Sequence, residues 1–167
     1  MELWDLYTRD RRLTGETHIR GEKLPPERYH LVVHVWIKNG RGEWLISQRA
    51  ASRPAFPLKW ESVGGSVTAG EDSLTGAIRE AKEEVGVDLD PAQGRLVSST
   101  VREHFQDIKD DWLFLYDGEI DLRKATTDEV ADIRWMTVEE IRQLYDADEL
   151  VYTLGYFFEE KELGGQA

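Results

Sequence analysis

The sequence predicts a single domain of the α/β (α+β) class, in which a mixed β-sheet is sandwiched between helices. Three observations predict this fold. Segments of strand length recur along the 167-residue chain, an amphipathic helix lies between two groups of them, and no strong linker divides the chain. A chain of this length is long enough for one hydrophobic core and short for two.

The N-terminal half is expected to be mostly β-structure. Four segments rich in branched and aromatic residues predict strands: 2–7, 13–19, 29–37 and 44–48. The first two form a hairpin, and Asn39-Gly40 marks the turn between the last two. The expected divisions of the single domain (1–167) are an N-terminal hairpin or extension, a core and a C-terminal helix, over residues 1–28, 29–147 and 148–167.

Residues 72–85 predict the clearest helix. Its apolar residues recur at steps of four, three and four and form one stripe: Leu74, Ile78, Ala81 and Val85. Gly86 follows the stripe, where a left-handed residue commonly ends a helix. This segment is therefore expected to pack on the sheet through its apolar stripe.

The remainder of the chain alternates strands and helices. Three further strands are predicted over residues 95–101, 112–120 and 131–136, and the polar stretch 103–111 is expected to be a loop. Thr137 followed by Glu140 forms a capping-box pattern at the start of a helix over 137–145. A terminal helix is expected over residues 151–160.

Composition excludes several classes of function. The chain has no cysteine, so disulfides, zinc-thiolate sites and thiol nucleophiles are excluded. Its net charge of −12 argues against binding bulk nucleic acid or anionic membranes, which requires clusters of Lys and Arg. Neither a signal peptide nor a bilayer-length apolar run is found, so a cytoplasmic protein is expected.

Three glutamates are concentrated on the predicted helix. Glu80, Glu83 and Glu84 lie at positions i, i+3 and i+4 and share one face, expected to lie opposite the apolar stripe. A solvated acidic face and a divalent-cation site both explain this spacing. Gly76 lies one turn earlier, and a mid-helix glycine costs about 1 kcal/mol relative to alanine. It indicates that another part of the molecule closely approaches the helix.

The segment around these glutamates resembles the Nudix box, the motif of the Nudix hydrolase family. The pattern G-x5-E-x7-R-E-U-x-E-E-x-G-U, where U is aliphatic, is matched at every fixed position over residues 65–87. The matching residues are Gly65, Glu71, Arg79, Glu80, Ala81, Glu83, Glu84, Gly86 and Val87. Alanine at position 81 is the mildest point of the match.

The resemblance implies a Nudix-type α/β/α sandwich and a pyrophosphohydrolase that uses Mg²⁺ or Mn²⁺. Its substrate would be a nucleoside diphosphate linked to another moiety, or a related small-molecule diphosphate. The same resemblance implies that Glu80 and Glu84 are metal ligands and that Glu83 is a third ligand or positions the attacking water. The backbone carbonyl of Gly65 would complete the ligand set.

The resemblance also implies a supporting pair, in which Arg79 and Glu71 hold the loop against the helix and orient the glutamates. The identity of the general base varies within the family and stays open here.

Candidates outside the motif have two interpretations each. Glu129 resembles a downstream acid that supplies a ligand or base in many relatives, and it also fits a loop glutamate. Arg49 is placed to contact phosphate, or is a surface arginine. Glu103, Asp110 and Asp111 flank a strand and fit the same role as Glu129, but solvated loop acids are the expectation for them.

Two histidines alternate onto one face of the strand over 29–37. For His30 and His34, packing or a hydrogen bond is the expectation. Substrate specificity is expected in loops outside the motif, over residues 50–60, 103–111 and 121–130.

The N-terminal half is also similar to isopentenyl-diphosphate isomerase, a branch of the same superfamily. That enzyme needs a cysteine, whose expected place is Gly64, and a following histidine, whose place is Ser66. His18 and His30 correspond to two of its other histidines. Because the chain has no cysteine and keeps the intact Nudix box, hydrolysis is favoured over isomerisation. A non-catalytic nucleotide-binding module is the third alternative.

Oligomeric state stays open at this point. The N-terminal hairpin and aromatic residues near the C-terminus, such as Tyr156 and Phe157, are candidates for a homodimer interface or for packing on their own domain.

Overall fold

The computed structural model describes residues 1–165 of the chain. Its strands are β1 (Leu3–Tyr7), β2 (Leu13–Ile19), β3 (His30–Lys38), β4 (Trp44–Arg49), β5 (Trp60–Glu61), β6 (Val63–Ser66), β7 (Gly94–Arg102), β8 (Asp107–Leu115) and β9 (Val130–Met136). The α-helices are α1 (Ser73–Val85) and α2 (Val138–Asp146), and the 3₁₀ helices are η1 (Pro91–Gln93), η2 (Glu103–Phe105), η3 (Leu122–Lys124) and η4 (Tyr152–Phe158). Within residues 1–165, no helix has the length and apolar character needed to cross a membrane.

A mixed seven-stranded sheet forms the centre of the molecule. The main strand order is β5-β4-β3-β8-β7, and β6 and β9 pair with β3 and β4 respectively. β3 runs parallel to β8 and antiparallel to β6, so His34 lies beside Asp111 on one side and Gly64 on the other. Since β3 pairs with β4 only at Lys38 and Trp44, the strands diverge beyond their turn and β6 takes the place beside β3.

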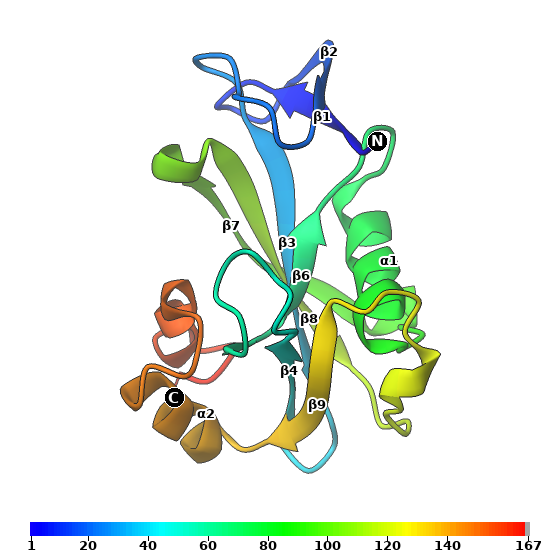
Figure 1. Cartoon of the computed structure of the whole chain (residues 1–167), viewed down its shortest axis with the longest axis vertical. Helices are drawn as coiled ribbons and strands as arrows, with labels where there is room; N and C mark the ends of the chain where they lie inside the picture. The colour runs from blue at the N-terminus through cyan, green and yellow to red at the C-terminus, as the bar shows by residue number, and fades with distance from the viewer. Residues whose placement is uncertain (166–167) are drawn as a thin grey trace.

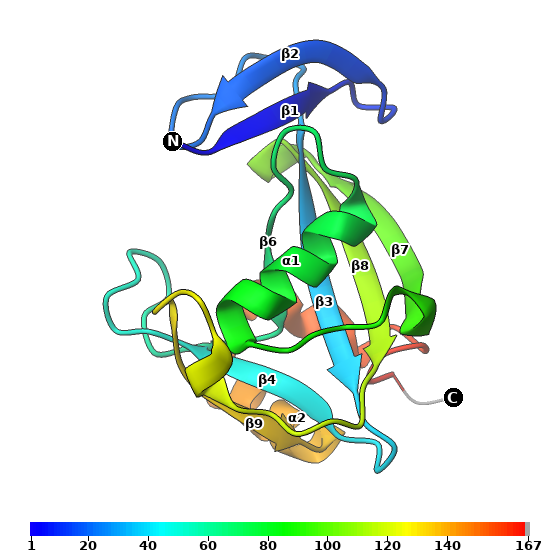
Figure 2. The same cartoon turned by 90° about the vertical axis from the view of Figure 1, so that its right-hand side faces the viewer.

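Helices cover both faces of this sheet, which confirms the predicted sandwich. Figure 2 shows α1 crossing in front of β3 and β8, with α2 at the lower end beside β4 and β9. One buried cluster lies between α1 and the sheet and includes Val33, Val35, Ala77, Ala81 and Phe114. The second lies under α2 and η4 and includes Trp36, Trp44, Ile141, Leu154 and Phe157.

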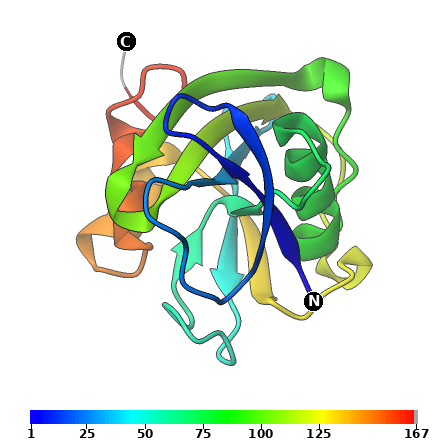
Figure 3. The ribbon, with the colours of Figure 1, turned by 90° about the horizontal axis from the view of Figure 1, so that it is seen from above.

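The N-terminal hairpin forms a separate two-stranded sheet at one end of the molecule (Figures 1 and 3). It is attached at several points. Tyr7 and Tyr29 exchange backbone hydrogen bonds of 2.8 and 3.0 Å, and Ala69 N–H donates to the Leu3 carbonyl at 2.8 Å. β1 is therefore hydrogen-bonded to the loop that precedes α1.

Most predicted elements are confirmed, and the exceptions have physical causes. β8 begins at Asp107 rather than at residue 112, so most of the polar stretch 103–111 is strand and not loop. The short strands β5 and β6 were not predicted, because two glycines and serine obscure any β-pattern there. The terminal helix expected over 151–160 is present as the 3₁₀ helix η4.

The C-terminal aromatics pack on their own chain. Phe157 is fully buried against Trp36, with ring centroids 4.6 Å apart, and the Tyr156 hydroxyl bonds with Trp36 and His34. These two side chains are therefore part of the domain's own packing rather than an open surface for a second copy.

The buried face of α1 differs from the predicted one. Asp72 caps the helix by accepting from Thr75 N–H at 2.8 Å. Glu80 and Glu84 are buried together with the apolar residues instead of lying on the opposite face; the buried apolar positions are Ala77, Ala81 and Val85. The close approach predicted at Gly76 is confirmed, because a side chain there would come within 2.9 Å of Val67 Cγ2.

Gly86 ends α1 as predicted, and its replacement should be costly. Its φ is 70°, and an added Cβ would lie 2.6 Å from the carbonyl carbon of Lys124. We expect Gly86→Ala to lower the free energy of unfolding by about 2 kcal/mol or more, from left-handed backbone strain and the clash together. Urea denaturation followed by circular dichroism measures this loss.

Gly42→Ala is the matched control. Gly42 also has a positive φ, 78°, but no atom lies within 4 Å of its added Cβ. It should lose only the backbone component, about 1 kcal/mol. Equal losses for the two variants would show that the contact with Lys124 does not restrain the helix end.

Candidate active site

The glutamates of α1 form a buried carboxylate pair. Glu80 and Glu84 are 8% and 7% exposed, whereas the Glu83 side chain is 39% exposed. Burial raises the pKa of Glu80 to about 7. Burial, with the neighbouring Glu80 and Glu61 carboxylates, raises the pKa of Glu84 well above its usual value. Two such groups in contact cannot both stay ionised without a cation beside them.

Arg79 connects this pair to the preceding loop. Its guanidinium donates to both Glu71 oxygens at 2.7 and 3.0 Å and to the Ser66 carbonyl at 3.0 Å. It also donates to Glu80 at 3.1 Å and to Glu83 at 2.9 Å. The residues predicted as a supporting pair thus contact one another and two of the three glutamates.

Gly65 borders the carboxylates from β6. An added Cβ would lie 2.5 Å from the carboxyl carbon of Glu80. Only glycine leaves room there for the Glu80 carboxylate, so the backbone of β6 and the face of α1 enclose the same small space.

Two arginine–glutamate pairs lie opposite α1. Arg49 is half-buried rather than fully on the surface, and its Nη1 lies 2.8 Å from Glu61 Oε2. Arg53 Nη1 lies 2.8 Å from Glu129 Oε1, and Arg53 Nε is buried without a hydrogen-bond partner among residues 1–165. Burial raises the pKa of Glu61. Arg53 and Glu61 were not identified from the sequence, because their proximity to α1 depends on how the 50–60 loop folds back.

A cavity of about 210 Å³ joins the α1 carboxylates to the Arg53–Glu129 pair, whereas Arg49 and Glu61 line a different cavity. The former cavity is lined by the three α1 glutamates with Arg79, by Gly64 and Gly65, by Arg53 and Glu129, by Thr127, and by Glu2 and Arg20 of the hairpin. The two hairpin residues are paired, with Arg20 Nη1 3.1 Å from Glu2 Oε2. No sequence signal pointed to them, since they are remote in the chain from the motif.

Two of the acids predicted to be solvated are fully buried in β8. Asp110 receives both Nη groups of Arg11 at 2.7 Å, and Asp111 lies 2.8 Å from Lys109 Nζ. The prediction was wrong for these two because each has a partner in or beyond the sheet. Glu103 is exposed as expected, and accepts from the Tyr29 hydroxyl at 2.6 Å.

The donor set fits a divalent cation. Within residues 1–165, no three His, Asp or Glu side chains already surround a common point at metal-binding distances. The carboxylates of Glu61, Glu80 and Glu129 nevertheless each raise the pKa of Glu84. A hard cation such as Mg²⁺ prefers carboxylate oxygens and would relieve this repulsion. Glu80 and Glu84 would hold it.

Comparison with known proteins places this chain in a family. The family model described as the NUDIX domain matches residues 28–154. This chain belongs to the Nudix family. An uncharacterized Nudix hydrolase of Listeria innocua is 42% identical to it over 160 residues, covering 95% of this chain and 91% of the relative. The chain is therefore a hydrolase of the Nudix family.

A solved structure shares the fold of this chain, and a second relative matches part of its sequence. The crystal structure of DR0079 from Deinococcus radiodurans superposes with a TM-score of 0.71 at 23% identity, covering 90% of this chain and 92% of that one, and shows the same fold. Isopentenyl-diphosphate Delta-isomerase of Escherichia coli is 36% identical over 67 residues, 40% of this chain and 37% of that enzyme. The predicted resemblance to the isomerase branch is confirmed as a partial one.

Proposed function

We propose that this Nudix hydrolase is a Mg²⁺-dependent pyrophosphohydrolase that cleaves a nucleoside diphosphate-linked or related small-molecule diphosphate. The observation that carries the proposal is the buried Glu80–Glu84 pair facing Gly65. A bound cation neutralises the diphosphate and activates a water molecule. The net charge of −12 supports a small-molecule substrate rather than bulk nucleic acid or a membrane surface.

The surrounding residues have separable roles in this proposal. Glu80 and Glu84 bind the cation, and the Arg79–Glu71 pair fixes the helix face against the loop. Glu83 is the most exposed of the three glutamates and has Arg79 as its hydrogen-bond partner, which suits a group that positions water. The guanidinium of Arg53 lines the same cavity as the three glutamates, which places it to contact a phosphoryl oxygen.

A broad substrate screen tests the proposal. The purified protein is incubated with Mg²⁺ and a panel of nucleoside diphosphate derivatives, and release of nucleoside monophosphate or phosphate is measured. Turnover that disappears on chelation is the expected result. Mg²⁺ binding without turnover of any diphosphate would instead support a non-catalytic binding module.

Glu83→Gln separates ligation from water positioning. We expect turnover to fall by at least about tenfold, as for a lost catalytic group, with metal affinity unchanged. Mn²⁺ binding followed by electron paramagnetic resonance, together with kcat on the best substrate, gives both quantities. A parallel loss of affinity and turnover would make Glu83 a metal ligand.

A further inference from the structure

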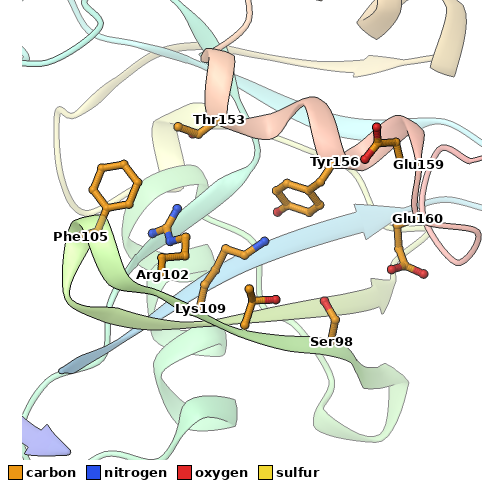
Figure 4. A pocket seen from close by; sticks show the side chains of 9 residues that line it. Ser98, Arg102, Phe105, Lys109, Thr153, Tyr156, Glu159 and Glu160 are labelled. Atoms are coloured by element: carbon orange, nitrogen blue, oxygen red, sulfur yellow. The ribbon is translucent and has the colours of Figure 1, made fainter. Parts of the chain in front are cut away.

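Two further cavities lie beside the carboxylate site on the face of the sheet away from α1. The nearer one, about 180 Å³, is lined by His34, Arg49, Arg53 and Glu61, together with Gly64, Gly65 and neighbouring residues. The next one, about 490 Å³, lies between β7, β8 and η4 (Figure 4). Thr153 lines both, so the two cavities are adjacent and lead away from the glutamates.

A hydrogen-bond network lies between the two cavities and centres on the Tyr156 hydroxyl. Trp36 Nε1 donates to it at 3.2 Å, His34 Nδ1 lies 2.6 Å away, and Asp111 Oδ1 accepts its proton. The hydroxyl has one proton to donate, and indole N–H can only donate. The group that accepts this proton therefore decides whether His34 Nδ1 donates to the hydroxyl or accepts from it.

Asp111 is the recipient. It is fully buried, with Lys109 Nζ 2.8 Å and Ser98 Oγ 3.0 Å from its Oδ2. Because Lys109 Nζ and Ser98 Oγ both direct hydrogens at Oδ2, the Asp111 carboxylate is the acceptor of this network. Burial and the neighbouring Asp111 raise the pKa of Tyr156, so the hydroxyl keeps its proton and directs it to Asp111.

His34 must then donate through Nδ1. Because the Tyr156 proton is given to Asp111, the contact of 2.6 Å requires a hydrogen on His34 Nδ1. Burial lowers the pKa of His34 to about 3, so the ring is neutral. Its Nε2 consequently carries a lone pair, and within residues 1–165 it has no hydrogen-bond partner while the side chain lines the nearer cavity.

We propose that His34 is a specificity-determining residue that accepts, through Nε2, a hydrogen bond from a hydroxyl or N–H group of the substrate's organic moiety. The inference rests on the proposed function. A diphosphate diester carries only acceptors at neutral pH, so its oxygens are repelled by this lone pair. They face Arg53 and the carboxylate site, while a donor on the attached moiety faces His34. Tyr156 and Asp111 are positioning residues that fix the tautomer.

The larger cavity favours a substrate whose organic moiety extends as an uncharged group. Lys109 is neutralised by Asp111, and Arg102 by Asp107, whose Oδ2 lies 2.6 Å away. Figure 4 shows Phe105 and Tyr156 on its walls, with Glu159 and Glu160 at one end. No unpaired cation among these lining residues is available to a further phosphate. The substrate class is thus a diphosphate with a neutral, hydroxyl- or N–H-bearing group, rather than a longer polyphosphate.

Nuclear magnetic resonance of nitrogen-15 histidine tests the tautomer without any turnover. At neutral pH, His34, assigned by its loss in His34→Gln, should be neutral and protonated on Nδ1. Tyr156→Phe should shift it toward the Nε2–H form. Tyr152→Phe, an exposed tyrosine on the same 3₁₀ helix, should leave it unchanged. An imidazolium or an Nε2–H ring in the unaltered protein would overturn the proposal.

Ligand addition tests the acceptor role in the same spectra. In the presence of Mg²⁺, ribose 5-phosphate should move the His34 Nε2 resonance in the direction of an accepted hydrogen bond, and inorganic phosphate should not. No movement with saturating sugar phosphate, or equal movement with both, would overturn the proposal. A protein that shows these shifts but hydrolyses no diphosphate would refute only the proposed function.

Discussion

Glu84→Gln is expected to lower turnover by at least about a hundredfold, as is typical when an essential metal-site group is lost. The Glu84 carboxylate is buried against Glu80, and the Glu61 and Glu129 carboxylates also raise its pKa. An amide of the same shape cannot supply the negative charge that attracts a cation. Steady-state kinetics at saturating Mg²⁺ measure the loss.

The same substitution should not weaken the folded protein. Burying a carboxyl group beside another is unfavourable, so its replacement by a neutral amide removes repulsion from the metal-free state. Thermal unfolding in the presence of a chelator should give a midpoint equal to or above that of the unaltered chain. Glu139→Gln, an exposed glutamate on α2, is the control for loss of one charge. Normal turnover in Glu84→Gln would show that Glu84 is not a ligand.

Arg79→Ala is expected to have the largest effect on stability. The guanidinium makes five hydrogen bonds, to Glu71, Glu80, Glu83 and the Ser66 carbonyl. Its removal leaves partly or fully buried carboxylates unpaired, and we expect a loss of about 2–4 kcal/mol in the free energy of unfolding. Urea denaturation of the metal-free protein measures it.

Two comparisons make the Arg79 result specific. Arg123→Ala removes a guanidinium that is 90% exposed and paired with Asp121, and it should leave the unfolding midpoint unchanged. Adding Mg²⁺ should restore part of the stability lost in Arg79→Ala, because a cation bound to the folded state replaces the missing charge. A stability loss that is insensitive to Mg²⁺ would mean that Arg79 supports the fold independently of the cation site.

The sequence was informative wherever local chemistry decides structure. The caps of α1 and α2, the hairpin and the strand β3 follow from residue type and spacing, and the sandwich follows from their order. The motif also identified the residues that meet at the carboxylate site. Helical periodicity, however, placed Glu80 and Glu84 opposite the apolar stripe and left open whether they are solvated, because burial of charge is the exception that functional sites impose on the pattern.

The remaining errors concern contacts that form only when the sheet and loops are folded. Asp110 and Asp111 looked like loop acids because the chain around them is polar, and only the fold shows that Arg11 and Lys109 neutralise them within β8. Arg53 was missed because its contact with Glu129 spans 76 positions in the chain, 53 to 129. No spacing rule relates residues brought together by loop closure.

The N-terminal hairpin also bears on how the protein is divided for experiment. The recognisable family domain begins at residue 28, yet Glu2 and Arg20 form part of the wall around the carboxylates, and Arg11 neutralises the fully buried Asp110. Removal of residues 1–27 would open the cavity around the carboxylates and leave Asp110 in the central sheet without its arginine partner. The part of the chain that the family model matches is therefore smaller than the part that encloses the carboxylates.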